Sequence, residues 1–326
     1  MRPMLGGIAI LSFTVALIAL RVLLSRFGRF ALDRPNERSL HERPVPRSGG
    51  LAILLGTATS LALGAVEAWV PASIALGLAL VSFVDDLRGM PTALRLFLHL
   101  GGAALLCWFL LSPMHPVSLG LLILGLTWIT NLYNFMDGSD GLAGGMSVIG
   151  FGAYAVAAHL SGHGALAALS VALAASSLAF LLHNFHPARI FLGDVGSIPL
   201  GFLAGGLGIL GWRDDLWPLW FPLLVFGPFI GDATLTLVRR LAKGERVWRA
   251  HRDHYYQRMV RMGLGHRTTA WIAYAVMALC ALAALLGRDV RPAYQAVVFG
   301  AATAVLMGLA VWVDLRWRRF LRTPVL

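Results

Sequence analysis

The sequence predicts an all-α integral membrane protein that crosses the bilayer about eleven times, and three observations predict it. First, 58% of the 326 residues are hydrophobic and only 13% are charged, with a mean hydropathy of +0.73. Second, apolar runs of membrane-spanning length follow one another along the whole chain. Third, the basic residues gather in alternate connecting loops, as the positive-inside rule describes.

The apolar runs predict the spans in order, with a single domain over residues 1–326, because no internal repeat or low-complexity linker divides the chain. The first run has only Arg2 before it and lacks a clear small-residue cleavage site, which favours a retained span over a signal peptide. Cys107 and Cys280 each lie inside a run and predict no disulfide or thiolate metal site. The expected spans are residues 4–24, 49–67, 71–84, 94–112, 117–133, 143–160, 164–183, 196–212, 217–238, 269–287 and 293–313.

The distribution of charge predicts the orientation, with the N-terminus outside and the C-terminus in the cytoplasm. Of the 27 Lys and Arg residues, only Arg2, Arg213, Arg288 and Arg291 then lie on the outer side. The net charge of +11 therefore fits anionic lipid head groups, and we do not expect a nucleic-acid partner. The cytoplasmic loops that would build a site are about 25–48, 85–93, 134–142, 184–195 and 239–268.

Acidic residues from several loops meet on this predicted inner face. They are Asp85, Asp86, Asp137, Asp140 and Asp194, while Asp232 lies inside the ninth span, where a carboxylate is a site candidate by default. The pair Asp214-Asp215 falls in an outer loop and serves as a control, since there a solvated turn explains it. The side of the membrane, and not the dipeptide itself, marks the candidate site.

The chemistry of these acids favours a hard cation. Asp85 and Asp86 would repel each other unless a cation or a proton lies between them, so they suit Mg²⁺ binding or a carboxylate acting as a base. Asp194 stands between glycines at the start of the eighth span, which suits a phosphate-bound metal. Asp137 and Asp140 could share a hard cation or a ribose and its phosphates. Oxygen donors dominate, which favours Mg²⁺ or Mn²⁺ over Zn²⁺.

Two basic loops are open to two interpretations. The loop 239–268 is either a juxtamembrane segment on anionic lipid or a diphosphate site, because His251 and His254 share one face of any helix and have arginine neighbours. The loop from Asp33 to Gly50 could clamp phosphates or anchor to the membrane surface. The other histidines that we considered receive structural roles: His99, His115, His159 and His163.

Taken together, five motifs in order resemble the polyprenyl-phosphate N-acetylhexosamine-1-phosphate transferases, from about residue 33 to 258. Each motif alone is weak, but the ordered set on one membrane side is specific. The motifs are Pro44-Val45-Pro46-Arg47-Ser48-Gly49-Gly50, Asp85-Asp86, the stretch Asn131 to Gly141, the stretch Asn184 to Asp194, and His251 with His254.

This resemblance implies a reaction, a cofactor and a location. Such enzymes move a sugar 1-phosphate from a UDP-N-acetylhexosamine onto a lipid phosphate, commonly undecaprenyl phosphate in bacteria, and release UMP. They need Mg²⁺ or Mn²⁺. It also implies a multi-pass protein of the bacterial inner (cytoplasmic) membrane, surrounded by membrane lipids, with its active site on the cytoplasmic face. The oligomeric state stays open, a homodimer included.

Carried over motif by motif, the resemblance also implies roles for single residues. Asp194 would be the main metal ligand together with Asp86, and Asp85 and Asp86 would position or deprotonate the lipid phosphate. His251 and His254 would hold the diphosphate as catalytic groups. The implied substrate contacts are Arg43, Asn134, Asp137, Asp140, Asn184, Phe191 and Arg252, with Asp140, Asn184 and Phe191 at the uridine.

Departures from the family pattern narrow the branch. The branch that makes the peptidoglycan lipid precursor usually carries three adjacent histidines, and here they are interrupted as His251-Arg252-Asp253-His254. That branch also has Lys where this chain has Arg88. The segments around Asp232 and His254 resemble instead enzymes that initiate O-antigen or related surface polysaccharides. The expected donor is UDP-GlcNAc or a 6-deoxy analogue such as UDP-FucNAc or UDP-QuiNAc, and the alternative is a phospho-MurNAc-pentapeptide transferase.

Rivals from other classes fit less well. A membrane transporter would place its ionisable groups near the bilayer midplane in broken helices, whereas here they gather at one face. A structural or lipid-binding membrane protein would explain the basic loops but not the converging acids. A CDP-alcohol phosphotransferase would need a dense aspartate array on one helix pair.

Overall fold

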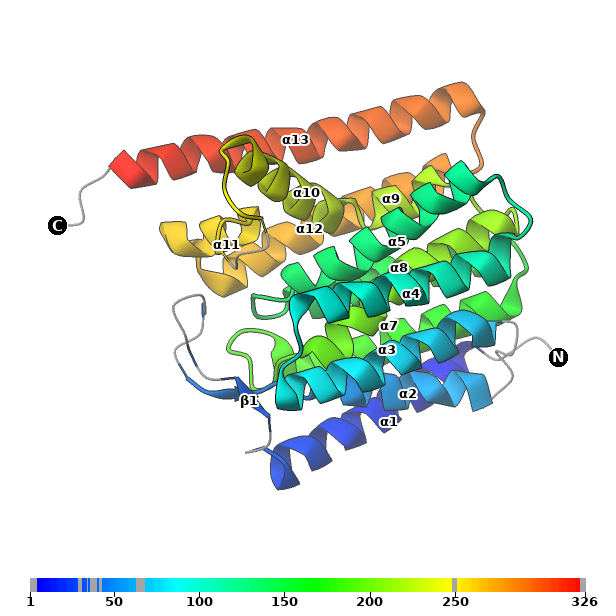
Figure 1. Cartoon of the computed structure of the whole chain (residues 1–326), viewed down its shortest axis with the longest axis horizontal. Helices are drawn as coiled ribbons and strands as arrows, with labels where there is room; N and C mark the ends of the chain where they lie inside the picture. The colour runs from blue at the N-terminus through cyan, green and yellow to red at the C-terminus, as the bar shows by residue number, and fades with distance from the viewer. Residues whose placement is uncertain are drawn as a thin grey trace.

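The computed structural model describes residues 5–28, 31–33, 35, 40, 43–62, 68–247 and 251–322, and most of them are helical. Most helices lie along the long axis of the molecule, so that their loops gather at its two ends (Figure 1). The helices are α1 (Leu5–Arg26), α2 (Gly49–Ala62), α3 (Trp69–Arg88), α4 (Thr92–Leu111), α5 (Pro116–Phe135), α6 (Leu142–Leu160), α7 (Gly164–Asn184), α8 (Asp194–Arg213), α9 (Trp220–Val225), α10 (Gly227–Ala242), α11 (Tyr255–Met259), the π-helical turn η2 (Val260–Leu264), α12 (Gly265–Gly287) and α13 (Pro292–Arg322).

The prediction of an all-α polytopic membrane protein is confirmed. Within the described residues, nine helices are long and apolar enough to cross a membrane: α1, α3 to α8, the stretch Tyr255–Gly287 and α13. The other two expected spans, 49–67 and 217–238, correspond to the shorter α2 and to the pair α9 and α10. Helix α1 begins at the end of the bundle opposite to the end where α13 finishes (Figure 1), but which end faces the cytoplasm stays a prediction.

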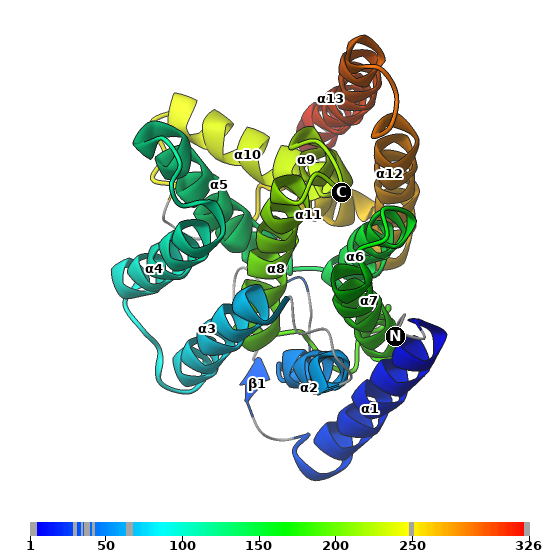
Figure 2. The same ribbon diagram turned by 90° about the vertical axis from the view of Figure 1, so that its right-hand side faces the viewer.

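Helix α8 forms the centre of the bundle. Figure 2 shows it with α3, α4 and α5 on one side and α6 and α7 on the other. Every residue from Val195 to Gly211 is buried. Its glycines allow the neighbours to approach closely, since a Cβ at Gly201 would meet Tyr133 of α5 at 2.6 Å. The first residue of this central helix is Asp194, so the helix delivers a carboxylate to the middle of one end of the bundle.

The ninth expected span is not one helix. It breaks at Phe226 (φ −94°, ψ 10°), between α9 and α10, and in Figure 2 α10 turns away from the bundle toward α5. Pro228 is in the first turn of α10, where a backbone N–H has no acceptor within the helix, so the missing N–H of proline costs no hydrogen bond. Pro228 also disfavours a helix that would continue from α9 into α10. The expected continuous span over 217–238 was therefore wrong in this detail.

A short hairpin fixes the end of the first loop. Strands β1 (Leu32–Asp33) and β2 (Val45–Pro46) pair antiparallel, and the segment after β2 runs beside residues 191–192. The amides of Gly49 and Gly50 donate to the carbonyl oxygens of Phe191 and Leu192, both at 2.9 Å. A Cβ at Gly50 would overlap Gly196 of α8, so this backbone approach requires glycine.

Parts of the expected cytoplasmic loops lie outside the described residues, namely residues 29, 30, 34, 36–39, 41, 42 and 248–250. The remaining loop residues lie at the same end of the molecule as β1 and α11, on the left in Figure 1.

Candidate active site

Two cavities adjoin at this end of the bundle. The first, which we call the polar cavity, has a volume of about 260 Å³, and the second, the side cavity, about 650 Å³. Asn134, Asp194 and Gln257 line both, so the cavities meet at these three side chains. Most residues expected in the site line one or both of them: Asp85, Asn134, Asp137, Asp140, Asn184, Phe191, Asp194, His251 and His254.

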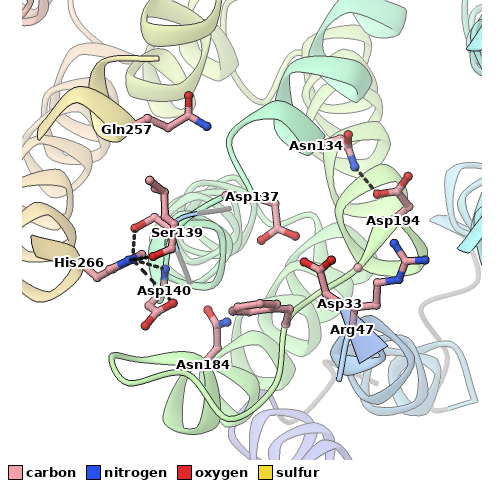
Figure 3. Close-up of a pocket in the computed structure, with 14 residues that line it drawn as sticks. Asp33, Arg47, Asn134, Asp137, Ser139, Asp140, Asn184, Asp194, Gln257 and His266 are labelled. Carbon is pink, nitrogen blue, oxygen red and sulfur yellow. Dashed lines mark hydrogen bonds and ion pairs between the residues drawn. The ribbon is translucent and has the colours of Figure 1, made fainter. Parts of the chain in front are cut away.

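The loop between α5 and α6 forms one wall of the polar cavity (Figure 3). Asp140 of this loop accepts hydrogen bonds from Nδ1 of His186 at 2.7 Å and from the amide of Ala188 at 3.1 Å. Asn184 accepts from the amide of Gly141 at 2.9 Å and donates to the carbonyl oxygen of Ile190 at 2.9 Å. Both side chains therefore join this loop to the α7–α8 connection while they face the cavity.

Asp194 lies where the two cavities meet. Its Oδ1 accepts a hydrogen bond from Nδ2 of Asn134 at 2.7 Å (Figure 3). The same amide nitrogen lies 2.8 Å from the hydroxyl of Ser197. The first turn of α8 also favours a carboxylate, because the helix N-terminus is the positive end of its dipole. Asp194 is therefore held in place by α5 while part of its side chain, 30%, stays exposed to the cavities.

Two arginines form ion pairs with Asp85 and Asp86. Nη1 of Arg47 lies 3.5 Å from Oδ1 of Asp86, and the amide of Val195 donates to Oδ2 of Asp86 at 3.3 Å. Nη1 of Arg95 lies 3.2 Å from Asp85 and 3.5 Å from Asp194, so one guanidinium bridges two carboxylates. Asp85 lines the side cavity, whereas Asp86 lines neither cavity and has 5% of its side chain exposed.

Asp137 lies among other acids. Burial and the carboxylates of Asp194, Asp86 and Asp33 raise the pKa of Asp137 well above its ordinary value. Only the fold brings these carboxylates together, since Asp33 comes from β1 and the others from three different helices or loops. A cation or a bound proton would reduce the repulsion between these carboxylates.

The oxygen donors fit a hard divalent cation. Among the described residues, no group of three or more His, Cys, Asp or Glu side chains is arranged to hold a metal ion. Mg²⁺ does not need such a cage, since it commonly binds one or two carboxylates together with substrate phosphates and water. Asp194 and Asp86 could supply that partial set, because the Val195 amide that follows Asp194 donates to Asp86.

The histidines of the α10–α11 connection line the side cavity, and His254 is held by Asp232. The carboxylate of Asp232 accepts from the amides of Tyr255 at 2.9 Å and Tyr256 at 3.0 Å, and lies 3.3 Å from Nδ1 of His254. The ring centroids of His251 and His254 are 4.9 Å apart. The carboxylate of Asp232 thus caps α11 and orients His254.

The structure does not bring every expected residue to the cavities. Arg43 and Arg252 are exposed and belong to the lining of neither cavity, so their substrate roles stay predictions. Arg47, four residues after Arg43, lines the polar cavity instead. His99, which we expected to be structural, lines the side cavity and bonds Asn131 at 3.1 Å.

Sequence reasoning missed three further lining residues. Arg95 had a usable signal, since a charged residue inside a span marks a site by default. Gln257 and His266 had none, because they reach the cavities only through the packing of α11 and α12. His266 lies 2.9 Å from the Ser139 hydroxyl and 3.2 Å from the carbonyl oxygen of Leu40, so it joins the first loop to the wall of the polar cavity.

The chain is similar in sequence to known proteins. Residues 68–212 match the model of the family described as glycosyl transferase family 4. The chain is 30% identical over 301 residues to a probable undecaprenyl-phosphate N-acetylglucosaminyl 1-phosphate transferase of Bacillus subtilis, with 85% of this chain and 84% of the relative covered. It is 31% identical over 355 residues to a decaprenyl-phosphate N-acetylglucosaminephosphotransferase of Mycolicibacterium smegmatis, with 92% and 87% covered. A phospho-N-acetylmuramoyl-pentapeptide-transferase of Shouchella clausii is 28% identical over 293 residues, with 78% and 88% covered.

Proposed function

The chain belongs to glycosyl transferase family 4, and we propose that it transfers an N-acetylhexosamine 1-phosphate from a UDP-sugar to undecaprenyl phosphate and releases UMP. At the level of reaction class, it is a membrane-bound phosphosugar transferase. The donor sugar, the lipid and the cation are the parts that we propose.

The observation that carries the proposal is the meeting of two unlike cavities at Asn134, Asp194 and Gln257. The polar cavity has the aromatic side chain of Phe191 beside amides and carboxylates, as a nucleotide requires. The side cavity adds apolar residues such as Leu96, Leu124 and Ile198 to its polar end, as a lipid phosphate requires. A reaction between two such substrates would take place where the cavities join.

In the polar cavity, Phe191 would stack on the uracil base, and Asp140 with Asn184 would hold the uridine. Asp140 and Asn184 already make hydrogen bonds within the protein, which fixes their positions before the nucleotide binds. Arg47 would face the phosphates from the opposite wall.

In the side cavity, Asp85 and Arg95 would receive the lipid phosphate, and His251 and His254 would hold the diphosphate of the donor. Asp85 or Asp86 would take the proton if the lipid phosphate arrives protonated. Arg95 would then exchange part of its contact with Asp194 for the phosphate, because an Arg–phosphate pair is bidentate and strong.

The step itself conserves charge and atoms without a redox partner. An oxygen of the lipid phosphate bonds to the sugar-linked phosphorus, and the bond from that phosphorus to the oxygen of UMP breaks, so UMP leaves with the electron pair. Bound Mg²⁺ or Mn²⁺ would neutralise charge on the phosphate oxygens. Asp194 and Asp86 would hold that ion, and the N-terminus of α8 and the arginines would stabilise the remaining charge.

The relatives support N-acetylglucosamine as the sugar in the donor, since their names contain it. The segment from His251 to Arg258, His-x-x-His-Tyr-Tyr-Gln-Arg, resembles that of enzymes with 6-deoxy donors, which keeps UDP-FucNAc or UDP-QuiNAc in the proposal. The reaction would be the first membrane step of an O-antigen or another cell-envelope polysaccharide. We do not retain the transporter alternative, because the matched relatives are transferases.

The reaction would take place at the cytoplasmic face of the bacterial inner membrane. The basic loops support this orientation, since the end of the bundle that carries both cavities is also the end with the loops rich in Lys and Arg.

The test is a donor panel with the purified protein in lipid. UDP-GlcNAc, UDP-FucNAc, UDP-QuiNAc and UDP-MurNAc-pentapeptide would each be mixed with undecaprenyl phosphate and Mg²⁺, and UMP would be measured by chromatography. We expect one of the first three donors to give the fastest release. Release with UDP-MurNAc-pentapeptide alone would move the chain to the peptidoglycan branch, and release with none would refute the proposal.

The first variant to test is Asp194→Asn. It keeps the hydrogen bond to Asn134 within reach but removes the charge, so we expect UMP release to fall by at least about 10³-fold if Asp194 holds the cation. Size-exclusion profile and thermal midpoint in detergent would show that the variant still folds. Wild-type activity in this variant would remove Asp194 from the site.

A further inference from the structure

A glutamine that the sequence did not single out lies where the two cavities join. Gln257 of α11 lines both the polar and the side cavity, a property it shares with Asn134 and Asp194. Only 7% of its surface is exposed. Because the proposed transfer would take place at this junction, Gln257 is close to the phosphorus that would change partners.

The orientation of its carboxamide is fixed by the helix that carries it. Gln257 is the third residue of α11, and its Oε1 accepts a hydrogen bond from the amide of His254 at 3.2 Å in a capping box. An amide whose oxygen is committed in this way must turn its Nε2 to the opposite side. Figure 3 draws the nitrogen on the side of Asn134 and Asp194 and the oxygen turned away.

The nitrogen is left with donor capacity at the junction. A Cβ placed at Gly138 would lie 3.6 Å from Nε2 of Gln257, so the nitrogen stands directly beside the Asp137-Gly138 step. The hydroxyl of Tyr256 also neighbours this carboxamide and donates to the carbonyl oxygen of Phe135 at 3.0 Å. Since the nitrogen carries two N–H bonds, one can serve Tyr256 and the other a ligand.

Helix α11, which carries Gln257, is held by carboxylates from two other helices. Asp232 of α10 accepts from the amides at its start, and Asp314 of α13 accepts from Arg239 at 2.5 Å and from Arg258 at 3.2 Å. A neutral donor on such a support would need no rearrangement during the reaction, which is the condition under which a hydrogen bond to a developing charge is most effective.

We propose that Gln257 is a catalytic residue that donates a hydrogen bond from Nε2 to a non-bridging oxygen of the transferred phosphate. This inference rests on the proposed function. It adds a neutral donor at the transferred phosphate, where the proposed reaction otherwise uses acids, arginines and histidines. No proton is transferred by Gln257, and no bond to it is formed.

A pair of substitutions separates this role from simple helix capping. Gln257→Glu keeps the capping acceptor, since Glu and Gln both complete a capping box, but it replaces the donor with a negative charge. Gln257→Met removes the capping acceptor and the donor without adding charge. Capping alone predicts that the Glu variant is fully active and the Met variant impaired. The catalytic role predicts the reverse order of activity, with the Glu variant folded and at least as stable as the Met variant.

The experiment measures UMP release and nucleotide binding with the full-length protein in detergent. We expect kcat to fall by about 10²-fold in Gln257→Met, the loss typical for one donor to a transition-state oxygen, and further in Gln257→Glu. Gln257→Glu should also weaken UDP binding about 10-fold or more by repulsion while uridine binding stays within about 2-fold. Gln295→Glu controls for an added carboxylate and should leave kcat unchanged, since Gln295 is in the first turn of α13. That helix starts at the end of the bundle opposite to α11 (Figure 1).

The outcomes keep the two proposals apart. A wild-type protein that releases no UMP with any donor would refute the proposed function. The ratio of UDP to uridine affinity would still report on Gln257 in that case. A Gln257→Glu variant with wild-type kcat, or one with an unchanged UDP-to-uridine ratio, would overturn the inference.

Discussion

His251 differs from its usual state in water. Burial, His254 and Arg240 lower the pKa of His251 from 6.5 to about 4, against the opposing effect of Asp253. His251 is therefore neutral at pH 7 in the protein without a bound diphosphate. Only 10% of its side chain is exposed, which keeps water from restoring its ordinary pKa.

This shift predicts how stability changes with pH. Below about pH 6.5 the unfolded chain binds a proton at His251 that the folded chain does not bind until about pH 4, so stability falls across this window as pH falls. We expect His251→Gln to lose less thermal stability than the wild type between pH 7 and pH 5, measured as the midpoint in detergent. An equal loss in both proteins would contradict a depressed pKa at His251.

At the scale of elements, the C-terminal helix supports the site without lining either the polar or the side cavity. Asp314 of α13 accepts hydrogen bonds from Arg239 of α10 and Arg258 of α11. Both guanidinium groups also lie over the ring of Tyr255, at 5.2 and 5.3 Å from its centroid. α13 therefore ties α10 to α11, and α11 carries the residues that face both cavities.

We expect Asp314→Ala to lower kcat by about 10- to 100-fold with little change in the KM for the UDP-sugar, because a displacement of about 1 Å at a reacting group can cost this much. Asp289→Ala is the matched control, since Asp289 is 73% exposed and pairs only with the adjacent Arg288 among the described residues. Steady-state UMP release from both variants would check this. Equal kcat values in the two would show that α11 holds its place without α13.

The elements also show what a sequence can predict. Helix positions followed from apolar runs because a membrane span needs about 20 apolar residues, which is a local property. Pro222 and Pro228 indicate a break between α9 and α10, but they lie within one apolar run, which predicts a single span. The choice of Arg47 over Arg43 was not readable, because it depends on the β1–β2 pairing and on Gly49 and Gly50 meeting the α7–α8 connection.

At the scale of the whole molecule, the sequence predicted which loops would meet but not how their side chains would be used. Asp140 and Asn184 were expected at the nucleotide, and both line the polar cavity while tying two loops together. Gln257 and His266 enter the site only because α11 and α12 pack against the α5–α6 loop. Contacts between residues more than 100 positions apart leave no local pattern.

The orientation in the membrane can be measured by labelling single cysteines. The native Cys107 and Cys280 are buried, at 0% and 1% exposed, so they give little background. We expect Lys243→Cys to react with a membrane-impermeant maleimide only after the cells are opened, and Asp289→Cys to react in intact cells. The reverse labelling pattern would show the opposite orientation, with both cavities on the outer side of the membrane.

The side cavity has a consequence for how the enzyme would meet its lipid. Its lining includes Leu96 and Leu124, which are 50% and 61% exposed on the flank of the bundle, and α10 turns away from the bundle beside it. A long polyprenyl chain could therefore enter sideways without leaving the bilayer. The search for this substrate is then diffusion in two dimensions, so the quantity that governs saturation is the mole fraction of the acceptor among the membrane lipids. Diluting the membranes in buffer would leave the rate per enzyme unchanged, whereas diluting the acceptor with inert phospholipid would lower it.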